Sequence, residues 1–257
     1  MKILKKLGKK IKKEFDKKAF SSVLKKIDDL SLTTLDSRRR NYFFKYNLSD
    51  FELKHNEISF IHTPKTGGFS IGSIMQSPFK NNAENIAFRN LGTHAPVSLI
   101  SSPSEYKYVT FIREPVERVY SYYRHVLHPE KGKNENYHDL ANKGLVHLLQ
   151  NCWEVRNLYC QYFSGFVYEE INEKFFEIAL KNLKNFYFVG NFHNFENEAK
   201  KLIDLLHLDC KNIPHLNKEN WRTEEKFEIP NKDRKLIQAY NYFDIKLYNS
   251  FIKHSNW

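Results

Sequence analysis

The hydrophobic positions from about residue 41 onward fall into two alternating patterns, short β-rich runs and longer runs with helical spacing. Three runs predict strands, at residues 57–62 (EISFIH), 106–112 (YKYVTFI) and 185–190 (NFYFVG). Apolar residues three and four positions apart predict helices at 68–76, 115–127, 139–150, 153–163, 171–184, 194–208 and 231–251. Strands that alternate with helices are typical of a parallel sheet with helices on both faces. We therefore expect a three-layer α/β fold with a central, mostly parallel sheet.

Several residues at the edges of these runs carry helix start or stop signals. Pro115 stands at the first position of one predicted helix, where proline is favoured because its missing N–H is not needed. Pro78 ends the predicted helix at 68–76. Asn194 is expected to open the helix at 194–208, with Glu196 and Glu198 in its first turn, where acidic residues complement the helix dipole.

The first 27 residues follow a different pattern, that of a basic amphipathic helix. Leu4, Leu7, Ile11 and Phe15 are spaced by three and four, and lysines fill most positions between them. Such a helix lies on an anionic membrane surface or on a partner, or else packs its apolar stripe on its own domain, and both interpretations stay open. Residues 31–40 are typical of a linker. We expect a leader at 1–40 and one domain at 41–257.

Composition and charge narrow the class of protein. A hydrophobic fraction of 41% over 257 residues suits one globular domain. No apolar run approaches the ~20 residues of a membrane span, and the N-terminus has no continuous apolar segment typical of a secretory signal. Three cysteines are too few for a disulfide framework, which favours a reducing compartment. We expect a cytoplasmic protein, peripherally associated with a membrane if residues 1–27 bind one.

The net charge of +11 lies mostly in the leader. Lys and Arg outnumber Asp and Glu by 14 to 5 in residues 1–40 but only by 27 to 25 in the rest of the chain. Binding to a phosphate backbone usually needs a basic face on the domain itself. Nucleic acid is therefore not expected as a partner.

The loop after the first predicted strand, HTPKTGG, has the composition of an anion-binding loop. Gly67 and Gly68 allow backbone N–H groups to converge on a phosphate, and the following helix adds the positive end of its dipole. Lys65 supplies a full positive charge, while Thr66 and Ser70 supply hydroxyl groups. The lysine precedes the glycine pair and an earlier glycine is missing, so this is not the Walker loop of ATP-binding proteins.

The loop after the second predicted strand, FIREPVERVYS, predicts another anion site. Arg113 ends the strand, and Ser121 lies eight residues on, where helical geometry turns it back toward the loop. A magnesium-dependent phosphotransferase would place an acidic metal ligand near such a strand end, and we find none, so no metal is expected. Glu117 and Arg118 are expected on the exposed face of the helix. Two anion sites favour a nucleotide with phosphates at two places.

Two segments resemble a known family. FIHTPKTGGFSI and YVTFIREPVERVYSYYR are similar to the 5′-phosphosulfate and 3′-phosphate motifs of the Golgi-type carbohydrate sulfotransferases, above all the heparan-sulfate 2-O-sulfotransferase-like and related bacterial proteins. The similarity is tight over residues 58–75 and 106–124, looser over the rest of 55–252, and does not include the leader. It implies a P-loop NTPase-like fold, and a donor, 3′-phosphoadenosine 5′-phosphosulfate (PAPS), that carries phosphates at two places.

The resemblance also implies roles for individual residues. Lys65 would bind the bridging oxygen and the 5′-phosphosulfate, and Arg113 and Ser121 would bind the 3′-phosphate. Residues around the 5′-phosphate would be Thr66, Gly67, Gly68, Phe69 and Ser70, and Asn217 and Lys218 resemble a late loop that closes over PAPS. The chain departs from the family pattern at Phe69, where threonine is usual, and at Glu114, where aspartate is common. The first departure removes a hydroxyl contact.

Sulfuryl transfer also needs a base for the acceptor hydroxyl and a positive charge for the leaving phosphate oxygen. Lys65 can stabilise the leaving group. His94, in the segment NLGTHAPVSLI between the two motifs, is the predicted base, since the resembling enzymes have a catalytic histidine in a similar place. His62, His125 and His128 are the competing candidates.

The sequence thus predicts a PAPS-dependent sulfotransferase that acts on a hydroxyl of an oligosaccharide, polysaccharide or glycolipid by in-line displacement. The alternative is a P-loop-like nucleotide kinase or phosphotransferase, which would require a magnesium carboxylate. A third hypothesis is a non-enzymatic module whose basic leader binds a membrane, an acidic polymer or nucleic acid, although the nearly neutral domain argues against nucleic acid as the main partner.

Overall fold

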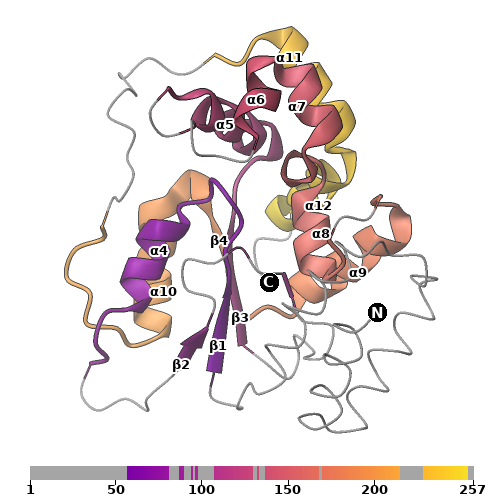
Figure 1. The fold of residues 1–257 in the computed structure, drawn as a ribbon. Helices are drawn as coiled ribbons and strands as arrows, with labels where there is room; N and C mark the ends of the chain where they lie inside the picture. The colour runs from indigo at the N-terminus through magenta and orange to yellow at the C-terminus, as the bar shows by residue number, and fades with distance from the viewer. Residues whose placement is uncertain are drawn as a thin grey trace, which may run out of the picture.

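The computed structural model describes residues 57–80, 87–89, 94, 96–97, 107–129, 132, 137–167, 170–214 and 228–253. The elements in these residues are, in chain order, β1 (Glu57–Ile61), α4 (Gly68–Met75), β2 (Ala87–Arg89), β3 (Lys107–Ile112), α5 (Pro115–Leu127), α6 (His138–Asn142), α7 (Leu145–Asn151), η4 (Trp153–Val155), α8 (Leu158–Ser164), α9 (Glu173–Lys184), β4 (Phe188–Asn191), η5 (Phe192–Asn194), α10 (Phe195–Leu205), α11 (Asn231–Tyr240) and α12 (Tyr242–Lys253). Apart from β2, a short strand that the sequence did not predict, strands and helices alternate as predicted (Figure 1).

The described strands form one parallel sheet in the order β2-β1-β3-β4. Ile61 of β1 is level with Thr110 of β3, and Ile112 of β3 is level with Asn191 of β4. The carboxyl ends of these three strands therefore meet at one edge of the sheet, and the segments that follow them start side by side.

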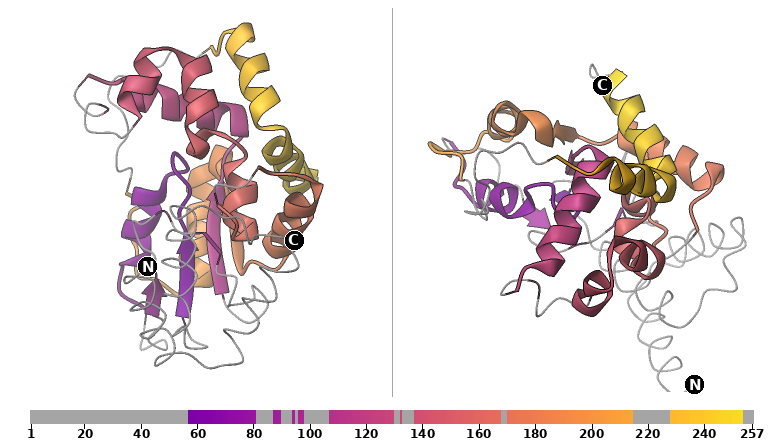
Figure 2. Two further views of the ribbon diagram at one scale, coloured as in Figure 1. Left: turned by 45° about the vertical axis from the view of Figure 1, so that its right-hand side comes forward. Right: turned by 90° about the horizontal axis from the view of Figure 1, so that it is seen from above.

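Helices cover both faces of the sheet, because the side chains of each strand alternate between two cores. Ile58, Phe60, Val109 and Phe111 pack against α4 and α10 on one face. The other face carries Ile61, Tyr108 and Ile112 and packs against α8, α9 and α12. Strands buried on both faces must be apolar almost throughout, which is why β1 and β3 were recognisable as short apolar runs. The three-layer α/β fold is confirmed (Figures 1 and 2).

The remaining helices lie beyond the carboxyl ends of the strands. Helices α5, α6, α7 and α11 form a third apolar cluster there, which includes Val119, Leu148 and Ile237. Figure 1 shows this group at the top of the molecule, above β1 and β3. Because α5 begins three residues after β3 ends, this group borders the edge at which ligands bind in open parallel sheets.

The strand order also has a reversal point, between β1 and β3. The chain leaves β1 through α4 toward β2 on one side, and leaves β3 through α5 to α9 toward β4 on the other side. In open α/β sheets the crevice at such a reversal is the usual ligand site. The two loops singled out in the sequence are the two that border it.

Several predicted boundaries agree with the structure and others need correction. Helix α5 spans residues 115–127 as predicted, and β1, β3 and α4 agree to within a residue at each end. The expected helix at 139–150 is two short helices, interrupted at Gly144, whose φ is 107°. The expected helix at 153–163 is the short η4 followed by α8. Asn194 does precede α10, but its side chain makes no capping hydrogen bond.

The last predicted helix, 231–251, is divided into α11 and α12 at Asn241. The fully buried side chain of this residue explains the break. Its Nδ2 donates to the carbonyls of Val155 (2.9 Å) and Ile237 (3.1 Å), and its Oδ1 accepts from the N–H of Asn157 (3.0 Å). The apolar period continues through the break, so the break could not be predicted from the spacing of the apolar residues.

The N-termini of α8 and α12 cap each other with side chains. Asp244 of α12 is fully buried and accepts hydrogen bonds from the N–H groups of Tyr159 and Cys160, both at 2.9 Å. Asn157, which precedes α8, accepts in turn from the N–H groups of Phe243 (3.0 Å) and Asp244 (3.2 Å). Four N–H groups that helix geometry leaves without partners are thereby satisfied. This exchange fixes α8 firmly against α12.

The expectation that Arg118 is exposed is wrong, because its side chain is fully buried. Its Nη2 donates to the carbonyl of Glu154 (3.1 Å), and its guanidinium lies 5.5 Å from the centre of the Tyr159 ring. Burial raises the pKa of Asp244, and the positive charge of Arg118 acts in the opposite direction. Arginine is rarely buried without a partner, which is why sequence reasoning placed it at the surface.

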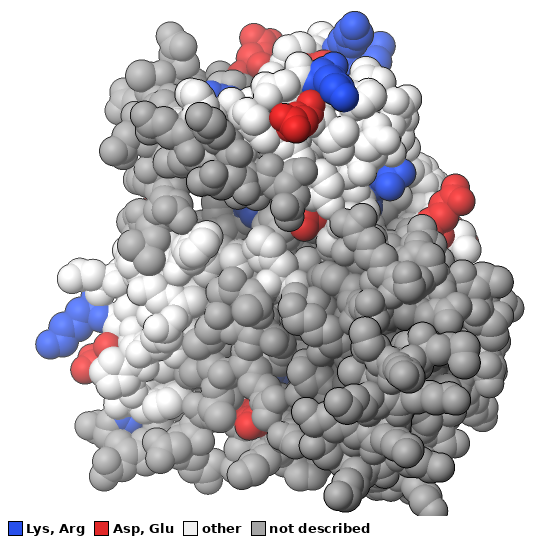
Figure 3. Space-filling model, viewed as in Figure 1, with Lys and Arg blue, Asp and Glu red and all other residues white. Residues whose placement is uncertain are grey.

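Basic and acidic side chains are interspersed over the described part of the face in Figure 3. Among the described residues no helix is both long enough and apolar enough to span a bilayer. The leader, residues 1–40, lies outside the described residues.

Candidate active site

The loop between β1 and α4 turns sharply at two residues in the left-handed region. Lys65 has φ 69° and Gly67 has φ 80°. The turn is held from inside, because the buried Thr66 hydroxyl donates to the carbonyl of Thr63 at 2.9 Å. The first α4 hydrogen bond, from Ile71 N–H to Gly67 O (3.1 Å), follows directly. The loop thus wraps around the N-terminus of α4, the positive end of the helix dipole.

Gly68 is required here because His62 occupies the space of a side chain. A Cβ on Gly68 would lie 1.7 Å from Nε2 of His62, far inside van der Waals contact. The imidazole is 2% exposed, and it stacks on the Phe60 ring at 5.5 Å with an interplanar angle of 6°. Phe69, by contrast, is 59% exposed, and its ring lies edge-to-face with that of His62, with 6.0 Å between centres.

His62 also contacts His94, the predicted base. The two ring centres lie 4.7 Å apart in an edge-to-face arrangement, although 31 residues separate them in the chain. Burial, and secondarily the charge of His94, lower the pKa of His62 to about 3. A weak base of this kind is a poor match for neutral pH. Of the two histidines at the loop, the exposed His94 is therefore the better candidate.

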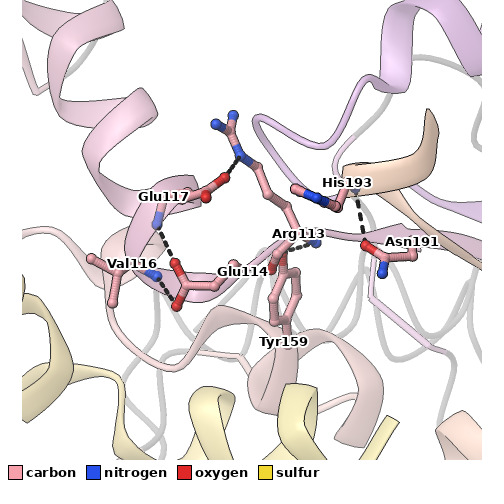
Figure 4. A network of polar contacts seen from close by, with 7 residues as sticks. All are labelled: Arg113, Glu114, Val116, Glu117, Tyr159, Asn191 and His193. Carbon is pink, nitrogen blue, oxygen red and sulfur yellow. Dashed lines mark hydrogen bonds and ion pairs between the residues drawn. The ribbon is translucent and has the colours of Figure 1, made fainter. Parts of the chain in front are cut away.

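The second loop starts from β3 with Arg113, whose side chain is seen in Figure 4. Nε of Arg113 donates to Oε2 of Glu117 at 3.2 Å, and the terminal nitrogens point away from that carboxylate (Figure 4). Glu114 caps α5 by accepting from the N–H groups of Val116 (3.1 Å) and Glu117 (2.8 Å). Since capping is a role that aspartate shares, the departure at Glu114 leaves the loop intact.

Ser121 lies one helical turn beyond Glu117, the residue that contacts Arg113, and so on the same face of α5. Its side chain is nearly buried, and its hydroxyl has no hydrogen-bond partner among the described residues. A buried hydroxyl without a hydrogen-bond partner lowers stability, so the Ser121 hydroxyl is expected to form a hydrogen bond in the functioning protein.

The ring of Phe192, directly after β4, lies between the two loops. A Cβ on Gly67 would be 2.9 Å from this ring, and the guanidinium carbon of Arg113 is 5.1 Å from its centre. The Thr63 hydroxyl also reaches the carbonyl of Phe111 on β3, at 3.4 Å. The lysine loop and the arginine loop are therefore direct neighbours.

A comparison with protein-family models matches residues 49–251 to the sulfotransferase family. The chain belongs to this family. Its enzymatic class follows: a sulfotransferase transfers a sulfuryl group, and the family's fold is P-loop-like, in agreement with the loop after β1. No curated protein matches the chain.

The structure brings together most of the site residues that the sequence predicted in this sulfotransferase. Lys65 to Ser70 form one loop and the start of α4, with Arg113 next to it and His94 beside His62. Asn217 and Lys218 lie outside the described residues, so their role stays a prediction.

Three residues at the site were not identified from the sequence as site residues: Tyr159, Tyr162 and Phe192. They come from α8 and from the segment after β4, and no local motif marks them. In the described part of the chain no group of three His, Cys, Asp or Glu side chains is arranged to hold a metal ion.

The buried, neutral His62 predicts an acid-sensitive stability. Between pH 6.5 and about 3 the unfolded chain binds a proton at His62 that the folded protein does not, so stability is lost as the pH falls through this window. Between pH 7 and pH 5 the wild type is expected to lose about 2 kcal/mol more unfolding free energy than His62→Gln. Urea unfolding at the two pH values measures the difference.

The control for this experiment is His193→Gln, which changes an exposed histidine after β4. It is expected to keep the pH dependence of the wild type. Equal losses in the wild type and in His62→Gln would show that His62 does not remain neutral in the folded protein.

Proposed function

We propose that this sulfotransferase uses PAPS as donor and a carbohydrate hydroxyl as acceptor, with His94 as the base and Lys65 at the leaving group. The observation that carries the proposal is the adjacency of the two anion loops. Phe192 contacts Gly67 and Arg113, and β1 and β3 are neighbouring strands. One nucleotide with a 5′-phosphosulfate and a 3′-phosphate fits such a pair of loops.

The residues present suit the two ends of this donor. Lys65 and the backbone from Thr66 to Ser70, at the N-terminus of α4, would bind the 5′-phosphosulfate. The guanidinium of Arg113 and the hydroxyl of Ser121, which lacks a partner among described residues, would bind the 3′-phosphate. Glu117 would hold Arg113 in place beforehand, through the contact to its Nε.

In the transfer, His94 would take the proton of the acceptor hydroxyl while the oxygen of that hydroxyl forms a bond to sulfur. The bond between sulfur and the bridging phosphate oxygen breaks, and the developing negative charge on that oxygen is stabilised by Lys65. The products are a sulfate ester, protonated His94 and 3′-phosphoadenosine 5′-phosphate (PAP). His62, which is uncharged above about pH 4, packs against His94 as a neutral ring.

The donor is tested by calorimetric titration with PAP in EDTA and with ATP plus Mg²⁺. PAP is expected to bind without metal and more tightly than ATP. Lys65→Ala is expected to weaken PAP binding by about 30-fold, because a charge-assisted contact contributes about 2 kcal/mol. The matched control is Lys107→Ala, an exposed lysine at the opposite end of β3. Tighter binding of ATP with Mg²⁺ would favour the kinase alternative.

The acceptor and the base are tested with ³⁵S-labelled PAPS and unsulfated heparosan and chondroitin. His94→Ala is expected to keep PAP binding within about twofold and to lose transfer by about 100-fold, in the range of general-base catalysis. His125→Ala and His128→Ala serve as controls, because they change the competing histidines. Full transfer by His94→Ala would overturn the assignment of the base.

A further inference from the structure

Helix α8 contacts the segments that carry two of the predicted site residues. Tyr159 and Tyr162 are three residues apart, which places them on neighbouring positions of the same helix surface, and both are fully buried. The first hydroxyl bonds to the backbone of Arg113 and the second to the backbone of His94. These two contacts come from one rigid element.

Tyr159 satisfies both main-chain polar groups of Arg113. Its hydroxyl accepts from the N–H and donates to the carbonyl, each at 2.8 Å. The residue before, Ile112, is the last of β3 and is paired with β4, so Arg113 is where the chain leaves the sheet. Here a single side chain sets the direction in which the Arg113 backbone continues, and with it the starting point of the guanidinium.

Tyr159 is itself held from three sides. Its N–H donates to Asp244 (2.9 Å), its ring stacks on Phe163 at 5.7 Å between centres, and the buried guanidinium of Arg118 lies 5.5 Å from the ring centre. A tyrosine restrained in this way has little freedom to move with Arg113. The restraint therefore acts on the arginine rather than the reverse.

Tyr162 links the helix to the segment of His94 by two hydrogen bonds. Its hydroxyl donates to the carbonyl of His94 at 3.3 Å, and its own carbonyl accepts from the N–H of Val97 at 2.8 Å. The ring of Tyr162 packs near Trp153, with 6.2 Å between centres. The position of the exposed His94 ring next to His62 thus depends on α8.

We propose that α8 is the positioning helix of the active site, in which Tyr159 places Arg113 for the 3′-phosphate and Tyr162 places His94 for proton transfer. Neither tyrosine touches substrate in this arrangement; each acts through another residue. The inference rests on the proposed function, since it takes from it the roles of Arg113 and His94.

Tyr159→Phe tests the first half by the contribution of the 3′-phosphate to binding. Titration of PAP and of 5′-AMP, which lacks that phosphate, separates the contribution from the rest of the nucleotide. The variant is expected to bind PAP about tenfold more weakly and 5′-AMP within twofold of the wild type. The double variant Tyr159→Phe with Arg113→Ala is expected to bind PAP no more weakly than Arg113→Ala alone, because both changes act on one contact.

Tyr162→Phe tests the second half by catalysis. It is expected to bind PAP within twofold of the wild type and to lower kcat about tenfold, with the polysaccharide that accepts sulfate from the wild-type protein. A second measurement does not depend on turnover: the imidazole Hε1 resonance of His94 is expected to shift in Tyr162→Phe and to stay unchanged in Tyr159→Phe.

The matched control is Tyr108→Phe, which removes a buried hydroxyl of the same core at the opposite end of β3. Tyr108→Phe is expected to change neither PAP affinity nor kcat by more than twofold. Circular dichroism checks the fold of all variants. Should Tyr159→Phe fail to fold, Arg118→Met, which removes the guanidinium beside the Tyr159 ring, is expected to give the same selective loss for PAP.

The outcomes separate the inference from the proposed function. A wild type that binds PAP and 5′-AMP equally overturns the assignment of the 3′-phosphate to Arg113, and with it the proposed function. If the wild type prefers PAP, two other outcomes overturn the positioning role alone. In the first, Tyr159→Phe keeps the whole preference for PAP. In the second, both tyrosine variants lose binding and turnover to the same extent.

Discussion

Gly68→Ala is expected to destabilise the protein by about 3 kcal/mol, at the upper end of what overpacking costs, and to remove PAP binding. The new Cβ would lie 1.7 Å from Nε2 and 1.9 Å from Cδ2 of His62. The imidazole cannot move aside cheaply, because Phe60 stacks on it and His94 packs against it in an edge-to-face arrangement. The backbone must shift instead, and its N–H groups then no longer converge on one anion.

The double variant Gly68→Ala with His62→Ala provides the control. Removing the imidazole makes room for the added methyl group, so the double variant is expected to be more stable than the sum of the two single changes by at least about 1 kcal/mol. Urea unfolding and PAP titration measure both effects. A Gly68→Ala protein with wild-type stability and affinity would mean that the contact between the loop and His62 does not determine the loop's shape.

Asp244→Ala is expected to lower the unfolding free energy by about 3 kcal/mol. The substitution removes the acceptor of two buried N–H groups at the start of α8 and leaves the buried charge of Arg118 with less compensation. Asp244→Asn keeps one acceptor oxygen and is expected to cost about half as much. Both values come from urea unfolding followed by circular dichroism.

Asp204→Ala is the control for this series, since Asp204 is an exposed aspartate with a side chain 78% accessible. It is expected to change stability by less than about 0.5 kcal/mol. A loss below about 1 kcal/mol in Asp244→Ala would show that α8 and α12 do not depend on the mutual capping.

Gly68→Ala and Asp244→Ala are expected to act on different parts of the protein. Gly68 lies in the proposed anion loop, so its substitution is expected to remove PAP binding together with stability. Asp244 accepts directly from the N–H of Tyr159 at the start of α8, so its substitution is also expected to loosen the position of this tyrosine. In Asp244→Asn, which keeps one acceptor oxygen, PAP affinity is expected to fall by less than the tenfold expected for Tyr159→Phe.

The sequence by itself predicted strands β1 and β3 and helices α4 and α5 to within a residue, and it singled out the loops that follow β1 and β3. It did not predict β2, and it placed the start of β4 at residue 185 rather than at Phe188. Apolar runs bounded by Pro64 and by the polar REP segment after Ile112 specify β1 and β3, because strands buried on both faces cannot include polar residues at random. The glycine pair with Lys65, and Arg113 with Ser121, are local patterns whose chemistry is visible without a fold. They also carried the resemblance to the family that the comparison then showed.

Only the tertiary structure decided which distant residues support these loops. The burial of Arg118, the contact of His62 with His94, and the bonds from Tyr159 and Tyr162 all join segments that lie far apart in the chain. Hydrophobic periodicity records which face of an element is buried, but not which neighbour covers it. Pairings between elements depend on sheet order and helix packing, and those are properties of the whole folded chain.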